Sequence, residues 1–255
     1  MTVIYNPYLV IVSAFIAVLA SYTALDLAGR VATSKGADRK VWLVGGAIAM
    51  GTGIWSMHFI GMLAFSLHSS AQQIPVGYNL PMTIISLLAA VFASGLSLSL
   101  VSRPRVGLPT LLTSAVFMGV GIGVMHYLGM AAMQMSATIR YDPTLFLLSV
   151  ALAVVVSLVA LKLSIKFRRQ TQNVNKKPQL IISALIMGAG ILSLHYTGMA
   201  AARFIEDYER YVVASASINN SSLAFYVACF TFLILGTTLV ITSDKAGREY
   251  SMRDF

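Results

Sequence analysis

Long apolar segments alternate with short polar loops along this chain. Seven segments carry enough consecutive apolar residues to cross a membrane, at about 8–30, 41–65, 80–101, 107–133, 144–166, 178–203 and 222–243. About 20 such residues in a helix span the hydrocarbon core of a bilayer, which is roughly 30 Å thick. With 57% hydrophobic and 11% charged residues, the composition excludes a soluble globular domain. The pattern predicts an all-α membrane protein with seven transmembrane helices in the lipid bilayer.

The apolar segments contain an internal repeat. Three stretches share the pattern M-G-x-G-I-x-x-[ML]-H-[FY]-x-G-M-x-A, hereafter the motif: MGTGIWSMHFIGMLA at 50–64, MGVGIGVMHYLGMAA at 118–132 and MGAGILSLHYTGMAA at 187–201. Each motif ends an even-numbered helix, and each odd-numbered helix before it begins near the turn YNPYLV, YNLP or YDPTLF. We predict three two-helix repeats, about 5–65, 78–133 and 141–203, in a pseudo-threefold arrangement. The segment 222–243 adds a seventh helix that resembles the first helix of a fourth unit, and a short tail, 244–255, follows it.

The positions of the charges predict how the helices are oriented. Of the 18 Lys and Arg residues, 15 lie in or beside the loops after the first, third, fifth and seventh helices, and the others are Arg140, Arg203 and Arg210. Because Lys and Arg accumulate on the cytoplasmic side of a membrane, we expect the N-terminus outside and the C-terminus inside. The net charge of +9 then reflects topology and some attraction to anionic lipids, with no nucleic-acid partner. The first residues, MTVIYNPYLV, lack the basic n-region of a cleaved signal peptide.

The motif places histidine and methionine on one helical face. Positions four residues apart lie on the same side of a helix, so Met, Ile, His and Met of each motif form a stripe. The stripes are Met50, Ile54, His58, Met62; Met118, Ile122, His126, Met130; and Met187, Ile191, His195, Met199. Glycines close to this face allow membrane helices to approach closely. We therefore expect the stripes to face one another, with the three histidines at one depth near the outer leaflet.

Three imidazoles at one register indicate a metal centre. A histidine in hydrocarbon is costly without a partner, and neutral imidazole is the commonest metal ligand. A single copy is more often a packed core residue, but packing does not require the same costly side chain three times. The candidate ligands are His58, His126 and His195 with Met62, Met130 and Met199, and, less well placed, Met57 and Met125, which Leu194 replaces in the third repeat. Thioether sulfur favours copper as the cofactor, with zinc as the alternative.

A few other polar residues are candidates for local roles. His68 lies in the loop FSLHSSAQQ without a counterpart in the other repeats and is expected either to cap the site or to have no role. Asp26 is expected to pair with Arg30 one turn later. The loop between the sixth and seventh helices contains Glu206, Asp207 and Glu209. These acidic residues are expected to form either a solvated loop or a funnel that attracts cations. The aromatic residues after the histidines are expected to be interface residues.

The motif resembles the MHYT-domain family of bacterial integral membrane proteins. The family's four-letter word corresponds here to MHFI at 57–60, MHYL at 125–128 and LHYT at 194–197, and the resemblance extends over about residues 8–240. It implies a sensor domain, about 1–243, in the bacterial cytoplasmic membrane. It also implies a copper ion held by His58, His126 and His195 with Met57 and Met125, and a diatomic gas ligand such as oxygen, carbon monoxide or nitric oxide. The usual partners are fused cytoplasmic domains that make or degrade cyclic di-GMP.

Three functions are compatible with these residues. The leading hypothesis is a copper-containing gas sensor that signals to the cytoplasm through a separate protein or a fused output domain, since SDKAGREYSMRDF after the last helix is too short to be one. The second is a membrane-embedded zinc or copper metalloenzyme, although the motifs contain no carboxylate for proton transfer. The third is a copper transport or delivery protein, for which Met50, Met118 and Met187 extend the stripe inward. A haem protein is disfavoured because haem takes one or two axial ligands.

Overall fold

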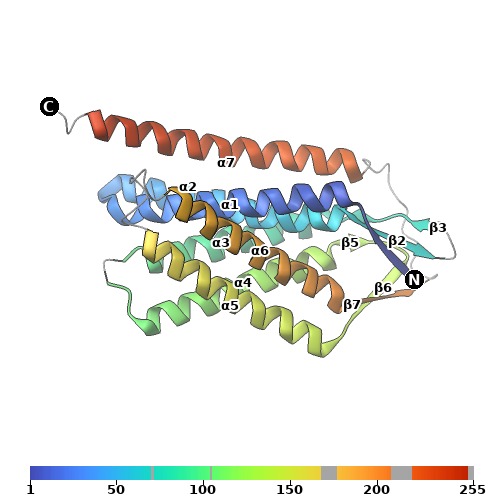
Figure 1. The fold of residues 1–255 in the computed structure, drawn as a ribbon. Coiled ribbons are helices and arrows are strands. Elements are labelled where there is room, and N and C mark those ends of the chain that lie inside the picture. The colour runs from blue at the N-terminus through green and yellow to red at the C-terminus, as the bar shows by residue number, and fades with distance from the viewer. Residues whose placement is uncertain (70–71, 104, 168–176, 208–219, 252–255) are drawn as a thin grey trace.

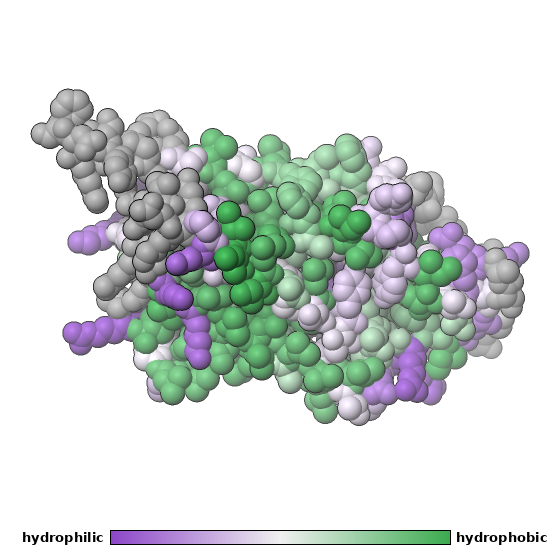
Figure 2. All heavy atoms as spheres, viewed as in Figure 1, coloured by the Kyte–Doolittle hydropathy of each residue, from purple (hydrophilic) through white to green (hydrophobic). Residues whose placement is uncertain are grey.

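Seven helices dominate the described part of the chain. The computed structural model describes residues 1–69, 72–103, 105–167, 177–207 and 220–251 (Figure 1). The helices are α1 (Pro7–Thr33), α2 (Gly36–Leu63), α3 (Leu80–Val101), α4 (Leu108–Ala131), α5 (Pro143–Phe167), α6 (Lys177–Ala201) and α7 (Asn220–Ser251). All seven are long and apolar enough to cross a membrane. Figure 2 shows the corresponding green apolar band between hydrophilic ends. The predicted fold class is confirmed.

The first six helices form a closed ring. Each helix contacts the next one in the sequence, and α6 returns to contact α1. The seventh helix lies outside this ring, against α1 and α2, as the red ribbon in Figure 1 shows. It runs to Ser251, past the expected end near 243, although its apolar span ends at Ser243. The ring agrees with the predicted pseudo-threefold arrangement of three helix pairs plus one added helix.

Short strands close each repeat at one end of the bundle, called here the strand end (Figure 1). In every repeat the strand before the odd helix pairs antiparallel with the strand after the motif helix. The pairs are β1 (Thr2–Tyr5) with β2 (Phe65–Ser69), β4 (Gly77–Tyr78) with β5 (Met133–Gln134), and β6 (Ala137–Tyr141) with β7 (Ala202–Glu206). The strand β3 (Gln72–Ile74) adds to the first pair. Each repeat is therefore a strand–helix–helix–strand unit, in which the strands were not predicted.

The Tyr-Asn and Tyr-Asp turns are helix caps. In each repeat the backbone N–H of the Asn or Asp donates a 2.8 Å hydrogen bond to the carbonyl of the alanine that ends the motif, at Asn6–Ala64, Asn79–Ala132 and Asp142–Ala201. The side chain of the same Asn or Asp accepts a 3.0 Å hydrogen bond from a backbone N–H in the first turn of the odd helix. Such caps satisfy donors that a helix start otherwise leaves without a partner. One residue thus anchors both helices of a repeat.

The odd helices present a repeated face of small residues to the bundle. The pattern S-x3-A-x3-S-x3-L occurs in α1, α3 and α5, and all of its residues are buried: Ser13, Ala17, Ser21, Leu25; Ser86, Ala90, Ser94, Leu98; and Ser149, Ala153, Ser157, Leu161. Small faces allow helices in a membrane to approach closely. The backbones of two helices come close at the first glycine of each motif: a Cβ added to Gly51 would lie 2.5 Å from Val91 Cα. Gly119 meets Val154 and Gly188 meets Val18 in the same way.

Candidate metal centre

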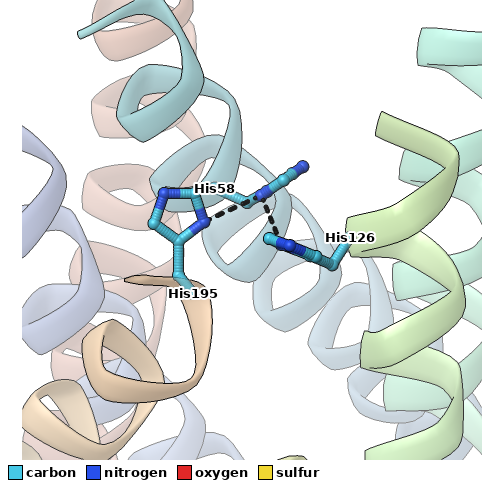
Figure 3. A group of neighbouring side chains, drawn as sticks. All are labelled: His58, His126 and His195. Atoms are coloured by element: carbon cyan, nitrogen blue, oxygen red, sulfur yellow. Dashed lines mark hydrogen bonds between the residues drawn. The ribbon is translucent and has the colours of Figure 1, made fainter. Parts of the chain in front are cut away.

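The three motif histidines converge on the axis of the ring. His58, His126 and His195 come from α2, α4 and α6, and their side chains are buried. The Nδ1 atom of His58 lies 3.0 Å from Nδ1 of His195 and 3.1 Å from Nδ1 of His126 (Figure 3). One nitrogen from each of the three lies within 4.8 Å of the others. The predicted convergence of the histidines is confirmed.

The spacing of the nitrogens fits a shared ion. Metal–imidazole bonds of about 2.0–2.1 Å in a tetrahedral site place neighbouring nitrogens about 3.3 Å apart. The two separations that involve His58, 3.0 and 3.1 Å, need to open only slightly to reach that value, and the nitrogens of His126 and His195 lie within 4.8 Å of each other. Without an ion, a hydrogen bond between two Nδ1 atoms requires a proton on one of them. An ion would be held by the Nδ1 atoms of the three histidines, with the protons on Nε2.

Each imidazole is held in place by a glycine of the neighbouring motif. The Nε2 edge of His195 packs on Gly61, that of His58 on Gly129 and that of His126 on Gly198. A Cβ added to Gly61 would lie 2.5 Å from His195 Nε2, and the other two glycines leave no more room. The glycine in H-x2-G therefore makes space for a ring from another helix. The three contacts run in one direction around the bundle.

The outward-facing nitrogens of the triad are buried against the neighbouring motifs. The Nε2 atoms of all three histidines are buried and meet no partner at ordinary hydrogen-bond geometry among the described residues. The Nε2 edge of His126 packs against the backbone of Gly198. A backbone group at the second nitrogen is a usual way to orient a ligating imidazole. The site thus offers three buried neutral imidazoles.

Among the methionines that follow the histidines, Met62 lies beside the triad. Met62, Met130 and Met199 are almost fully buried. A Cβ added to Gly129 would lie 3.5 Å from Met62 Sδ, so this sulfur lies beside the ring of His58. Their role as ligands remains a prediction.

The methionines that precede the histidines pack elsewhere. Met57 belongs to a cluster with Ile16 and Ala17 of α1 and Ala228 of α7. Met125 and Leu194 are both buried in the large cluster near the strand end. Packing accounts for their burial, and metal binding by Met57 and Met125 also remains a prediction.

Aromatic pairs join the motif helices to the strand end. The aromatic residue after each histidine meets the tyrosine of the next repeat's turn, with ring centroids 5.0 Å apart for Phe59–Tyr78, 5.1 Å for Tyr127–Tyr141 and 5.8 Å for Tyr196–Tyr5. Burial raises the pKa of Tyr5 and of Tyr141 to about 12. Burial also raises the pKa of Tyr78. The tyrosines therefore pack against the motif helices as neutral side chains.

The other candidates lie apart from the triad. Asp26 and Arg30 form the expected ion pair, at 3.3 Å, near the opposite end of α1. His68 lies in β2, where its Nδ1 is buried and has no hydrogen-bond partner among the residues described. Asp207 accepts a 2.8 Å hydrogen bond from Thr138, whereas Glu209 and Arg210 lie outside the described residues. An ion pair of 2.8 Å that the sequence did not indicate joins Arg203 to the cap residue Asp142.

Known proteins are similar to most of this chain. The family model described as "Bacterial signalling protein N terminal repeat", named MHYT, matches residues 51–114 and 119–174. The chain is 43% identical over 242 residues, 93% of its length, to the bifunctional diguanylate cyclase/cyclic di-GMP phosphodiesterase MucR of Pseudomonas aeruginosa. It is 35% identical over 250 residues, 97% of its length, to the signaling protein YkoW of Bacillus subtilis.

The likeness covers only part of these relatives. The chain spans 34% of the length of MucR and 30% of that of YkoW. No solved structure matches the fold. The three motifs, the three-repeat membrane fold and these likenesses show that the chain belongs to the MHYT family, the N-terminal repeat of bacterial signalling proteins.

Proposed function

We propose that this chain is a membrane-embedded sensor in which His58, His126 and His195 hold one copper ion that responds to a small diatomic ligand, namely oxygen, carbon monoxide or nitric oxide. The convergence of three buried Nδ1 atoms carries the proposal. Imidazole accepts copper or zinc, and the thioether of Met62 beside His58 favours copper. When bound, copper supplies an open position for the diatomic ligand.

The surrounding residues orient the imidazoles and keep water out. Gly61, Gly129 and Gly198 hold the three rings, and the aromatic pairs begin at the residues that directly follow the histidines, toward the strand end. Exclusion of water strengthens every electrostatic interaction in the site. Met130 and Met199 are further candidate thioether ligands. Met57 and Met125 are weaker candidates as ligands.

We place the strand end on the outer side of the bacterial cytoplasmic membrane. Support comes from the 15 of 18 Lys and Arg residues that lie at or near the loops and tail of the opposite end. In this orientation the triad lies near the outer leaflet and α7 ends in the cytoplasm.

We assign the relay of the signal to α7. Thr231 of α7 shares a buried hydrogen bond with Ser56, two residues before His58, and Ala228 packs in the same cluster as Met57. The equivalent positions of the other motifs, Val124 and Ser193, are exposed. A movement of the first motif helix is therefore passed to α7. Relatives named for making or degrading cyclic di-GMP suggest a cytoplasmic output of that class, fused or separate.

Copper transport or delivery is a second candidate, favoured by one observation. Met50, Met118 and Met187 line a single cavity on the side of the triad away from the strand end, so thioethers occur at two depths. Copper uptake into sealed vesicles tests this candidate. A zinc or copper metalloenzyme has less support, because the ligand group found among the described residues contains histidines and no carboxylate.

The sensor proposal is tested by metal analysis followed by gas titration. Purified protein is expected to carry about one copper per chain, and the triple variant His58→Ala/His126→Ala/His195→Ala none. Nitric oxide, carbon monoxide and oxygen are then titrated while the absorption spectrum is recorded. If the absorption spectrum of the copper-loaded protein does not change with any of the three gases, gas sensing is contradicted. If the protein binds zinc instead of copper, the metalloenzyme is favoured.

A further inference from the structure

A separate chamber lies inside the ring. It is lined by the first methionine and the isoleucine of every motif, Met50, Met118, Met187, Ile54, Ile122 and Ile191. These positions precede the histidines by eight and four residues, which places them about 12 and 6 Å farther along the helices. Small residues of α1 and α5, among them Ala20, Ala24 and Ala160, complete the wall. The space open to the centre of a water-sized sphere is about 40 Å³.

The chamber is large enough for water but poorly suited to it. One water needs only about 10–15 Å³ by the same measure, but it also needs two to four polar partners. Three serine hydroxyls belong to the wall. Ser21 donates to the carbonyl of Ala17 and Ser164 to that of Ala160, both on their own helix. Only Ser157 has a hydroxyl without a hydrogen-bond partner among these three wall residues.

We propose that this chamber is a binding site for a small apolar molecule of about the size of a diatomic gas. Dry apolar cavities in proteins bind apolar guests such as xenon. The residues that line an empty cavity lack dispersion contacts on the side that faces the cavity, and a bound guest molecule restores these contacts. Apolar gases also dissolve better in the hydrocarbon core of a membrane than in water, and the chamber lies near the middle of the helices. The site does not require the metal ion.

The position of the chamber gives it a role in the proposed sensor. The isoleucines form the part of its wall nearest the triad, because each lies one helical turn from its histidine. A gas held there is one turn away from the three imidazoles. The chamber therefore supplies the metal centre with its ligand from the membrane side. This role rests on the proposed function, whereas binding in the chamber does not.

Xenon is the direct probe of the chamber. We expect crystals of the full chain pressurised with xenon to show an anomalous peak between the methionine and isoleucine positions. The triple histidine-to-alanine variant, which lacks the metal ligands, should show the same peak. Ile122→Trp should lose it because the indole fills the chamber. Val120→Trp is the matched control: its side chain is exposed on the same helix, and the peak should stay.

The outcomes separate the chamber from the metal centre. Absence of xenon from the wild-type chamber, ordered water filling it, or an unchanged peak in Ile122→Trp overturns the inference. If Ile122→Trp does not fold, Ala160→Phe on α5 fills the same space from the opposite wall. Xenon bound in a protein that takes up no copper supports the chamber while contradicting the proposed metal sensor. In copper-loaded protein, Ile122→Trp should slow carbon monoxide association without changing copper content.

Discussion

The hydroxyl oxygens of Ser56 and Thr231 lie 2.5 Å apart, in a buried hydrogen bond that joins the first motif helix to α7. Thr231 Oγ1 also lies 2.7 Å from the carbonyl of Val227, one turn earlier on α7. Because a hydroxyl has a single proton, Thr231 donates to that carbonyl and Ser56 donates to Thr231. The bond breaks the pseudo-threefold symmetry two residues from a histidine of the triad.

Thr231→Val is expected to uncouple α7 from the metal centre. The substitution keeps the shape of the side chain but removes the acceptor for Ser56, at a cost of about 0.6 kcal/mol for a hydrogen bond between membrane helices. Copper content should stay unchanged. A spin label on α7 should stop responding when copper or carbon monoxide is added. Thr231→Ser keeps the hydroxyl and should respond normally, and a label that responds equally in both variants contradicts the relay.

Gly129→Ala is expected to weaken metal binding through His58. The added methyl group occupies the space of the imidazole Nε2 edge, so the ring must leave the position at which its Nδ1 meets the others. Loss of an orienting contact typically lowers metal affinity by about 10–100-fold. Competition with a chelator measures the change. Gly123→Ala on the same helix is the control, because its Cβ meets Val150 at an ordinary 3.7 Å. Equal affinities in the two variants would argue against the glycine pocket.

Two variants of Asp142, the cap residue of the third repeat, distinguish the contribution of capping to stability from that of charge. Asp142→Ala removes both the cap of α5 and the ion pair with Arg203, and it should lower the free energy of unfolding by about 1 kcal/mol. Asp142→Asn keeps the cap, as Asn6 and Asn79 do in the other repeats. It should cost less than about 0.5 kcal/mol, because Arg203 is exposed. Denaturant titration in detergent measures both, and an Asn variant as unstable as the Ala variant would mean that charge dominates.

Stability should fall in alkaline solution as the tyrosines of the strand end ionise. Burial raises the pKa of Tyr5 and Tyr141 to about 12, from an ordinary value of 10.0. The folded state holds the protons of these tyrosines more tightly than the unfolded state does. Their contribution to the free energy of unfolding is therefore complete below about pH 10 and is lost as the pH rises toward about 12. Melting curves over this range measure the effect. The double variant Tyr5→Phe/Tyr141→Phe should show a shallower decline, and an identical slope contradicts the assignment.

Much of the fold could be predicted because its signals are local. Apolar length marks each helix, the motif spacing marks the repeats, and the four-residue step of Met50, Ile54 and His58 identifies the face that points inward. The expectation that His58, His126 and His195 meet followed from one register on three equivalent helices. The structure confirms it through nitrogen separations of 3.0 and 3.1 Å.

The remaining features depend on contacts between distant residues. Strands of two to five residues carry too short a pattern to recognise, and Tyr5 finds its partner Phe65 only after two helices have folded. The packing of His58 on Gly129 joins two repeats, so neither motif alone predicts it. The placement of α7 has no counterpart in the repeats. By contrast, the pattern that includes Ser13 and Ala17 recurs in α3 and α5, was visible in the sequence and could have been found.

X-ray absorption at the copper edge tests the shared centre most directly. Protein loaded with one copper per chain should show about three imidazole nitrogens near 2.0 Å from the ion, and each single change, His58→Ala, His126→Ala or His195→Ala, should remove one of them or the copper itself. A spectrum without imidazole nitrogens, or one that is the same in all three variants as in the wild type, contradicts a single ion held by three helices.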